Sequence, residues 1–101
     1  ILLDLALRET KNHSIYFARR VVKNLKPVTP LNTRPMRSAG FRVLRAPDVP
    51  SVLLELGYLS NRHDEGNLVS SKWRRKAATA VTEAIEGFFS PEVAARQQMA
   101  Q

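Results

Sequence analysis

Hydrophobic positions recur at helical spacing near the start of the 101-residue chain. Over residues 2–25, apolar or small side chains return every three or four positions, and most basic side chains fall outside this stripe. Lys26-Pro27 then ends the pattern, because a residue before proline avoids the helical region. The spacing predicts an amphipathic helix over residues 2–25 whose core-facing stripe is Leu3, Leu7, Ser14, Phe17, Val21 and Leu25, with Ala18 and Val22 beside it.

A second helical stripe lies toward the end of the chain. Ser70 or Ser71 can cap its start, and Phe89-Ser90-Pro91 closes it. Just upstream, Asn61 followed by Asp64 resembles the capping box of a short helix that contains Gly66 or ends near it. The residues expected to face the core in the last helix are Trp73, Ala77, Val81, Ala84, Ile85 and Phe88.

Two short apolar segments separate these helical regions. Residues 27–40 hold three prolines and a glycine and are expected to form an irregular connector. Residues 41–45 (FRVLR) alternate apolar and basic side chains, which favours a strand, and residues 51–57 (SVLLELG) are nearly continuous apolar, which favours a strand covered on both faces. The order predicts an α/β fold with helices packed on a mostly parallel sheet. Because two strands are too few for such a sheet, we expect only the C-terminal part of a larger domain, with about two strands and three to four helices.

Charge and composition narrow the classes of function. The formal net charge is +7, and residues 1–50 hold ten Lys/Arg against three Asp/Glu. This favours an anionic partner, although a solvated basic helix face explains it equally well. Nucleic acid is not expected, because Phe17 beside Tyr16 lies on the core stripe and so offers no stacking platform. The lack of cysteine excludes disulfides and thiolate metal sites, and no segment is apolar enough for a transmembrane helix.

Glu55 is the one carboxylate in the apolar run 51–57. A period of two puts it on one face with Leu53 and Gly57, near the end of the expected strand, where sites form in open α/β sheets. Two interpretations stay open: a general base in an apolar setting, or a strand-end charge that turns to solvent or pairs with Arg45. His13 and His63 have no histidine partner at i+3 or i+4 and are interpreted as surface residues.

Residues 39–61 (AGFRVLRAPDVPSVLLELGYLSN) resemble the last part of the catalytic domain of zinc-dependent N-acetylmuramoyl-L-alanine amidases, which are bacterial cell-wall hydrolases. The helical segments at 5–25 and 70–89 are also similar to that family. We therefore expect residues 1–89 to form the C-terminal part of an amidase domain and residues 90–101 to be a tail, loosely helical or disordered. The family's pattern P-S-V-L-V-E-x-G-F-x-S-N is matched, with Tyr for Phe, by Pro50, Ser51, Val52, Leu53, Leu54, Glu55, Gly57, Tyr58, Ser60 and Asn61.

The resemblance implies hydrolysis of the amide between N-acetylmuramic acid and L-alanine by zinc-activated water, with Glu55 as general base. The zinc ligands, two histidines and a glutamate, belong to motifs before Ile1, so this chain alone is expected to hold no zinc and to be inactive. Arg37 and Arg45 are candidates to bind carboxylates of the peptidoglycan stem peptide.

The resemblance also implies an exported, periplasmic protein that acts in cell-wall remodelling or daughter-cell separation, with an activator protein that relieves autoinhibition. The alternatives are a non-catalytic basic module that binds an acidic polymer or a protein partner, and a degenerate amidase-like domain.

Overall fold

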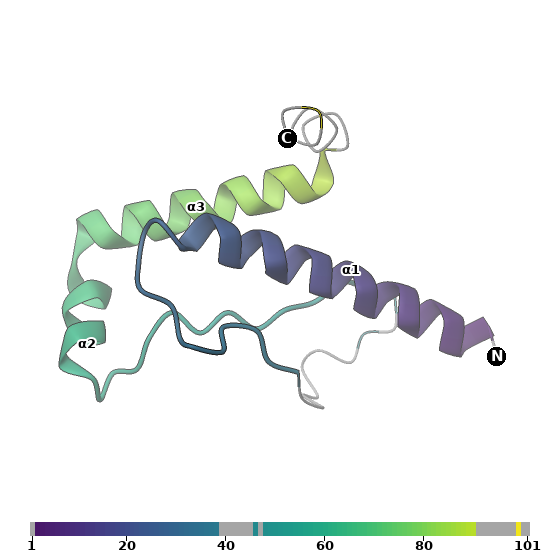
Figure 1. The fold of residues 1–101 in the computed structure, drawn as a ribbon, viewed down its shortest axis with the longest axis horizontal. Coiled ribbons are helices and arrows are strands. Elements are labelled where there is room, and N and C mark those ends of the chain that lie inside the picture. The colour runs from purple at the N-terminus through teal and green to yellow at the C-terminus, as the bar shows by residue number, and fades with distance from the viewer. Residues whose placement is uncertain (1, 39–45, 47, 91–98, 100–101) are drawn as a thin grey trace.

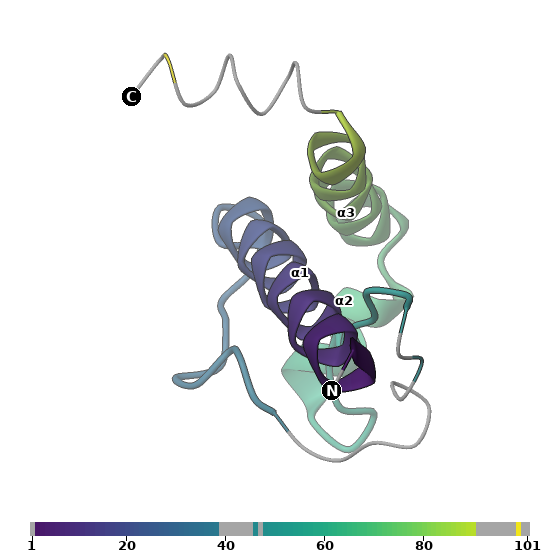
Figure 2. The same cartoon turned by 90° about the vertical axis from the view of Figure 1, so that its right-hand side faces the viewer.

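The computed structural model describes residues 2–38, 46, 48–90 and 99. These residues form helices α1 (Leu2–Leu25), α2 (Arg62–Val69) and α3 (Ser71–Phe89). α1 and α3 pack against each other and run in opposite directions, and α2 lies at the end of the molecule where α3 begins (Figure 1). The described residues between α1 and α2 lie below α1 in the view of Figure 1, whereas α3 lies above it. Figure 2 shows the same molecule along α1.

The predicted first helix is confirmed as α1. Its 24 residues contain neither glycine nor proline, so nothing interrupts the main-chain hydrogen bonds. At its end the amide of Lys26 still donates to the Val22 carbonyl at 3.0 Å, and the amides of Val28 and Thr29 both donate to the Leu25 carbonyl, at 2.9 and 3.1 Å. The chain turns there, at the Lys26-Pro27 step that the sequence predicts.

The two predicted C-terminal helices are also confirmed. The Asn61 side chain caps α2 by accepting a hydrogen bond from the Asp64 amide at 3.0 Å. Ser70 serves both helices: its amide donates to the Asn67 carbonyl at 3.0 Å, and its hydroxyl accepts from the Trp73 amide at 3.2 Å. Because one residue ends α2 and starts α3, the two helices meet at a sharp corner (Figure 1).

The core lies between the C-terminal half of α1 and the inner face of α3. The larger side chains of Val21 and Leu25 pack against small residues of α3, which let the two helices approach closely. The Asn24 side chain adds a cross-link by donating to the Ala80 carbonyl at 3.2 Å. The buried hydrophobic residues are Val21, Leu25, Ala77, Ala80 and Ala84, and Phe17, Val28, Leu31, Trp73 and Val81 pack around them.

Parts of the predicted stripes are not covered. Leu7 is 41% exposed, because the first turns of α1 extend past the end of α3 (Figure 1). Ile85 is also 41% exposed, so its predicted place in the core is wrong. Gly87, which the hydrophobic pattern does not single out, is buried instead.

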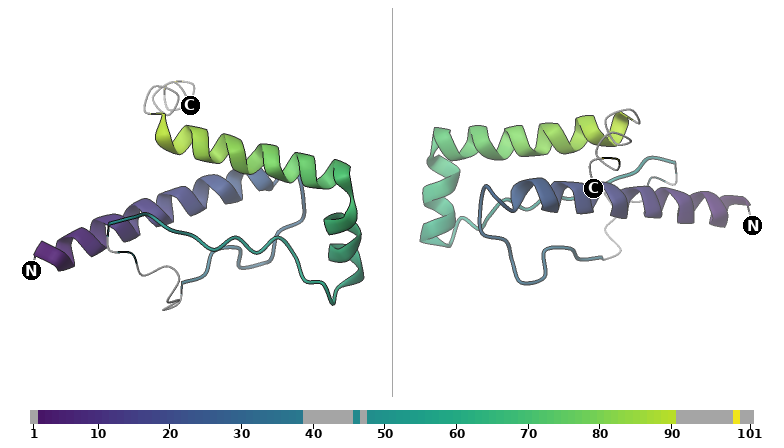
Figure 3. Two further views of the ribbon diagram at one scale, coloured as in Figure 1. Left: turned by 180° about the vertical axis from the view of Figure 1, so that it is seen from behind. Right: turned by 45° about the horizontal axis from the view of Figure 1, so that its top comes forward.

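The expected α/β fold is wrong for the described residues, which form helices and irregular segments and contain no strand. Residues 51–57 run as an irregular segment below α1 (Figure 3). A strand exists only when its main chain pairs with a neighbour, and no described segment pairs with this one. The other expected strand, residues 41–45, lies outside the described residues, as does most of the tail 90–101.

Candidate functional site

Glu55 lies on a segment that is held at its start by α1. The Ser51 amide donates a hydrogen bond to the Ser14 hydroxyl at 2.9 Å, and that hydroxyl donates in turn to the Thr10 carbonyl at 3.0 Å. Ser14 therefore fulfils both of its hydrogen-bonding roles, one along its own helix and one toward the segment. The contact ties residue 51 to α1 across 37 positions of sequence.

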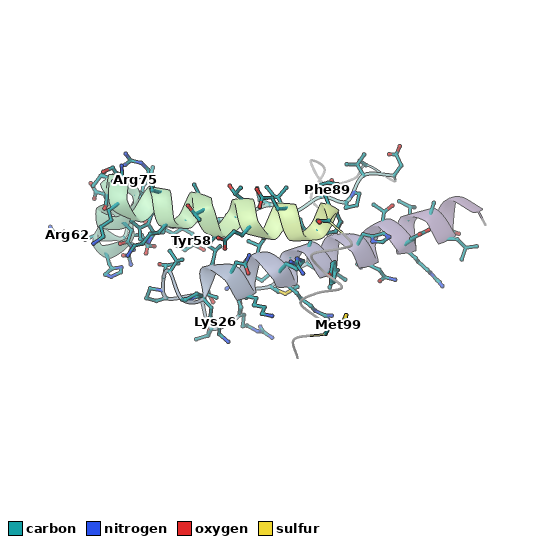
Figure 4. The ribbon with its side chains drawn as sticks, turned by 90° about the horizontal axis from the view of Figure 1, so that it is seen from above. Lys26, Tyr58, Arg62, Arg75, Phe89 and Met99 are labelled. Atoms are coloured by element: carbon teal, nitrogen blue, oxygen red, sulfur yellow. The ribbon has the colours of Figure 1, made fainter. Side chains whose placement is uncertain are left out.

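The far end of the segment is held by α2. The Tyr58 amide donates to Oδ2 of Asp64 at 3.0 Å, and the Asn61 amide donates to the Tyr58 carbonyl at 3.1 Å. Figure 4 labels Tyr58 and Arg62 toward the end of the molecule where α2 and the start of α3 lie. Glu55 thus sits between two anchored points, Ser51 and Tyr58.

The Glu55 side chain is exposed among the described residues. Its neighbours Leu54 and Leu56 are themselves 38% and 45% exposed. Glu55 makes no hydrogen bond or ion pair with any described residue. Its proposed pairing partner, Arg45, lies outside the described residues. Within this part of the chain, the carboxylate is therefore available to accept hydrogen bonds from a bound molecule.

A largely apolar cleft of about 640 Å³ runs between α1 and the irregular segments below it. Leu53 and Leu54, directly before Glu55, line it together with Arg37. The Arg37 guanidinium donates through Nη2 to Oδ1 of Asn32 at 3.4 Å, a long hydrogen bond that leaves its other donors for a ligand. The structure thus places Arg37 along the same cleft as the segment that carries Glu55.

The described residues do not fit a zinc site. They contain no group of three or more His, Cys, Asp or Glu side chains that could hold a metal ion. Nε2 of His13 lies 3.7 Å from Oε1 of Glu9 on the preceding turn of α1, and His63 is exposed in the first turn of α2. Both histidines are surface residues, as the sequence predicts. None of the described helices is long and apolar enough to cross a membrane.

Two contacts of the site escape sequence reasoning. The Ser14 hydroxyl stands out as the polar member of an apolar stripe, but nothing in the sequence names Ser51 as its partner. Asp64 stands out only as part of a capping box, whereas its carboxylate binds the Tyr58 amide. Both contacts join segments whose proximity depends on how the chain is folded.

The segment that carries Glu55 lies within a match to a known protein family. The profile for N-acetylmuramoyl-L-alanine amidase matches residues 5–87, which is most of the chain. This chain belongs to the N-acetylmuramoyl-L-alanine amidase family.

Individual relatives agree with this assignment. The chain is 36% identical over 89 residues to N-acetylmuramoyl-L-alanine amidase AmiA of Escherichia coli, covering 88% of this chain and 31% of that protein. It is 33% identical over 95 residues to AmiC of Neisseria meningitidis, covering 94% of this chain and 23% of the relative. It is 34% identical over 80 residues to the probable cell wall amidase LytH of Staphylococcus saprophyticus, covering 79% and 28%.

The chain therefore spans less than a third of the length of these curated relatives. No solved structure matches it significantly.

Proposed function

We propose that the intact protein is a peptidoglycan hydrolase that cleaves the amide between N-acetylmuramic acid and L-alanine, and that this chain supplies Glu55 as its general base. The observation that carries the proposal is the position of Glu55: its carboxylate is exposed and has no partner among the described residues, on a segment anchored at Ser51 and Tyr58. The family assignment supports the reaction.

In this proposal Glu55 transfers a proton as general base and then as general acid. A carboxylate within hydrogen-bond reach of the attacking water accepts its proton and then delivers it to the departing amine of L-alanine. This role requires a carboxylate whose lone pairs are free to accept a proton and whose main chain is held near the substrate. Glu55 has no partner among the described residues, and its segment is anchored at Ser51 and Tyr58. Arg37, on the same cleft, is proposed to bind a stem-peptide carboxylate by a charge-assisted hydrogen bond.

The resemblance also implies a zinc ion. Because the described residues do not form a site for it, its ligands are proposed to come from other parts of the intact protein. An exported, periplasmic location, a role in cell-wall remodelling or daughter-cell separation, and regulation by an activator protein are further proposals. The names of the relatives, which include a probable cell wall amidase, support the cell wall as the place of action.

Glu55→Gln in the full-length protein tests the base. The amide keeps the size of the side chain but cannot accept a proton, so release of L-alanyl peptides from purified peptidoglycan should fall by about 100-fold or more. The metal content of the purified protein should stay unchanged. Glu65→Gln is the matched control: Glu65 is an exposed glutamate in the first turn of α2, and its variant should keep normal activity. Full activity in Glu55→Gln would show that the assignment of the base is wrong.

Arg37→Ala tests the proposed substrate contact, with Arg34→Ala as control on the same connector. Loss of the Arg37 guanidinium should raise KM for peptidoglycan while kcat changes little, because binding and not proton transfer is affected. An unchanged KM would argue against Arg37 as a substrate ligand.

A further inference from the structure

We infer that Asp64 is a positioning residue for Glu55: its carboxylate, fixed on α2, holds the main chain just after Glu55 and so sets where the general base lies. The inference rests on the proposed function of Glu55. It concerns a residue that would touch neither substrate nor metal and would act only through the segment that carries the base.

The first support is the hydrogen bond from the Tyr58 amide to Oδ2 of Asp64, at 3.0 Å. A main-chain amide bound to a carboxylate makes a charge-assisted hydrogen bond, which is stronger than one between neutral groups. Asp64 is itself well fixed, because its own amide donates to the Asn61 side chain and its main chain belongs to the first turn of α2. Helix α2 thus fixes the main chain at Tyr58, three residues after Glu55.

The second support is the close packing of Gly57 on the same side chain. A Cβ atom at position 57 would lie 3.1 Å from Cβ and 3.3 Å from Cγ of Asp64, closer than ordinary van der Waals contact. No described glycine has a positive φ, so Gly57 is suited to its place by this close approach and not by an unusual backbone conformation. Asp64 therefore contacts two consecutive residues, 57 and 58, directly after the Glu55–Leu56 pair.

The geometry also shows that the Asp64 carboxylate is not used for helix capping. In a capping box, the side chain at the third helical position accepts a hydrogen bond from the amide of the N-cap residue. Here the Asn61 amide donates to the Tyr58 carbonyl instead, at 3.1 Å, and the Asp64 carboxylate accepts from the Tyr58 amide. Of the two hydrogen bonds of a capping box, the one accepted by the Asn61 side chain is formed. The Asp64 carboxylate does not make the second one and instead binds the segment that carries the proposed base.

Loss of the hydrogen bond between Asp64 and the Tyr58 amide should lower kcat and leave the binding of substrate unchanged. Between Ser51 and Tyr58 the segment forms no helix or strand, so its end points control its course. Without the Asp64 carboxylate, the Tyr58 amide loses its partner, and only the hydrogen bond from the Asn61 amide to the Tyr58 carbonyl still ties this end of the segment to α2. Glu55 would then sample positions away from the reacting water. A displacement of about 1 Å in a catalytic group can lower a rate by about 100-fold.

The test uses the full-length protein and measures kcat and KM for release of L-alanyl peptides together with thermal stability. Asp64→Ala should lower kcat by about 10-fold or more and leave KM within about twofold, since positioning acts on the reacting geometry. Asp64→Asn should restore most of kcat, because its Oδ1 can still accept from the Tyr58 amide. Glu65→Ala is the matched control: it removes the adjacent carboxylate of the same helical turn, with the same loss of favourable charge at the N-terminus of α2, but leaves the Tyr58 contact intact.

Gly57→Ala is a second, independent perturbation. Its Cβ would push the segment away from Asp64, so kcat should fall although the carboxylate is still present. This variant also keeps the inference testable if Asp64→Ala does not fold. If kcat is the same in Asp64→Ala, Gly57→Ala and Glu65→Ala, Asp64 has no positioning role.

A double variant separates this inference from the proposed function. If Asp64 acts only through Glu55, adding Asp64→Ala to Glu55→Gln should cause no further loss of kcat, because the base that Asp64 positions is already absent. A further loss equal to that of Asp64→Ala alone would overturn the inference and leave the role of Glu55 intact. Full activity in Glu55→Gln would overturn the proposed function itself.

Discussion

Gly87 of α3 lies directly against the side chain of Arg20 of α1. Gly87 is buried, and a Cβ atom there would overlap Nη2 of Arg20 and lie 2.7 Å from its Cζ and 3.1 Å from its Nε. Gly87 has no positive φ, so an alanine fits the helical backbone and only the contact with Arg20 is disturbed. Gly87→Ala therefore measures what the guanidinium contributes in its present position.

The guanidinium can move, since it is the end of a flexible side chain, but it would lose its contacts with Tyr16. These are a hydrogen bond from Nη1 to the Tyr16 hydroxyl at 3.3 Å and a cation–π contact with Cζ 5.8 Å from the ring centre. An exposed cation–π contact contributes about 0.5–1 kcal/mol, and a long exposed hydrogen bond about 0.5 kcal/mol. Replacing glycine by alanine within a helix returns about 0.5–1 kcal/mol. The free energy of unfolding should therefore change little, by about 0–1 kcal/mol, toward lower stability.

Gly66→Ala is the matched control, because Gly66 lies within α2 and a Cβ atom there would meet nothing within 4 Å. It should stabilise the protein by about 0.5–1 kcal/mol through helix propensity alone. The difference between the two variants removes the propensity gain and leaves about 1–1.5 kcal/mol for the Arg20 contacts. Urea unfolding of the full-length protein, followed by far-ultraviolet circular dichroism, measures both. Equal stabilisation by both substitutions would refute the reasoning, because Arg20 would then leave its position without loss.

Three further substitutions test the packing and the caps by the same urea assay. Leu25→Ala should lower the free energy of unfolding by about 2–5 kcal/mol, since Leu25 is 3% exposed and its loss leaves a cavity; a loss below about 1 kcal/mol would contradict its place in the core. Ser70→Ala should cost about 1 kcal/mol by removing the N-cap of α3, whereas Ser71→Ala should be nearly neutral; equal effects would contradict the capping role. Ala84→Val should cost about 1–3 kcal/mol by overpacking a fully buried site, and a neutral result would mean that the helices can separate without loss.

The helices and their ends follow from local sequence information. An amphipathic stripe, a proline step and capping side chains each act over a few residues, so the bounds near Leu25, Asn61 and Ser70 could be predicted without knowledge of the remaining chain. Glu55 could be singled out in the same way, because a carboxylate in an apolar run is unusual wherever the run lies. The family pattern around it is likewise a property of consecutive residues.

Whether residues 51–57 form a strand could not be predicted from those residues alone. A near-continuous apolar run favours a covered strand, but a strand needs a second main chain to pair with, and the described residues provide none. The covered position expected for Leu53, Leu54 and Leu56 is not found for the same reason: each is exposed, because no described segment forms a layer over it. The α/β expectation was therefore wrong where it depended on partners beyond the segment itself.

The sequence by itself determined three helices and their caps, and it singled out Glu55, the residue proposed here as the base, because these depend on neighbours along the chain. Only the tertiary structure decided which groups meet: the Ser14 hydroxyl and the Ser51 amide, and the Asp64 carboxylate and the Tyr58 amide. It also decided that the Arg20 side chain packs against Gly87. Each of these contacts joins a helix to a residue outside it. Hydrophobic periodicity encodes which face of a helix is buried, but it carries no information on which distant polar group lies opposite, since that depends on how the helices and connecting segments pack.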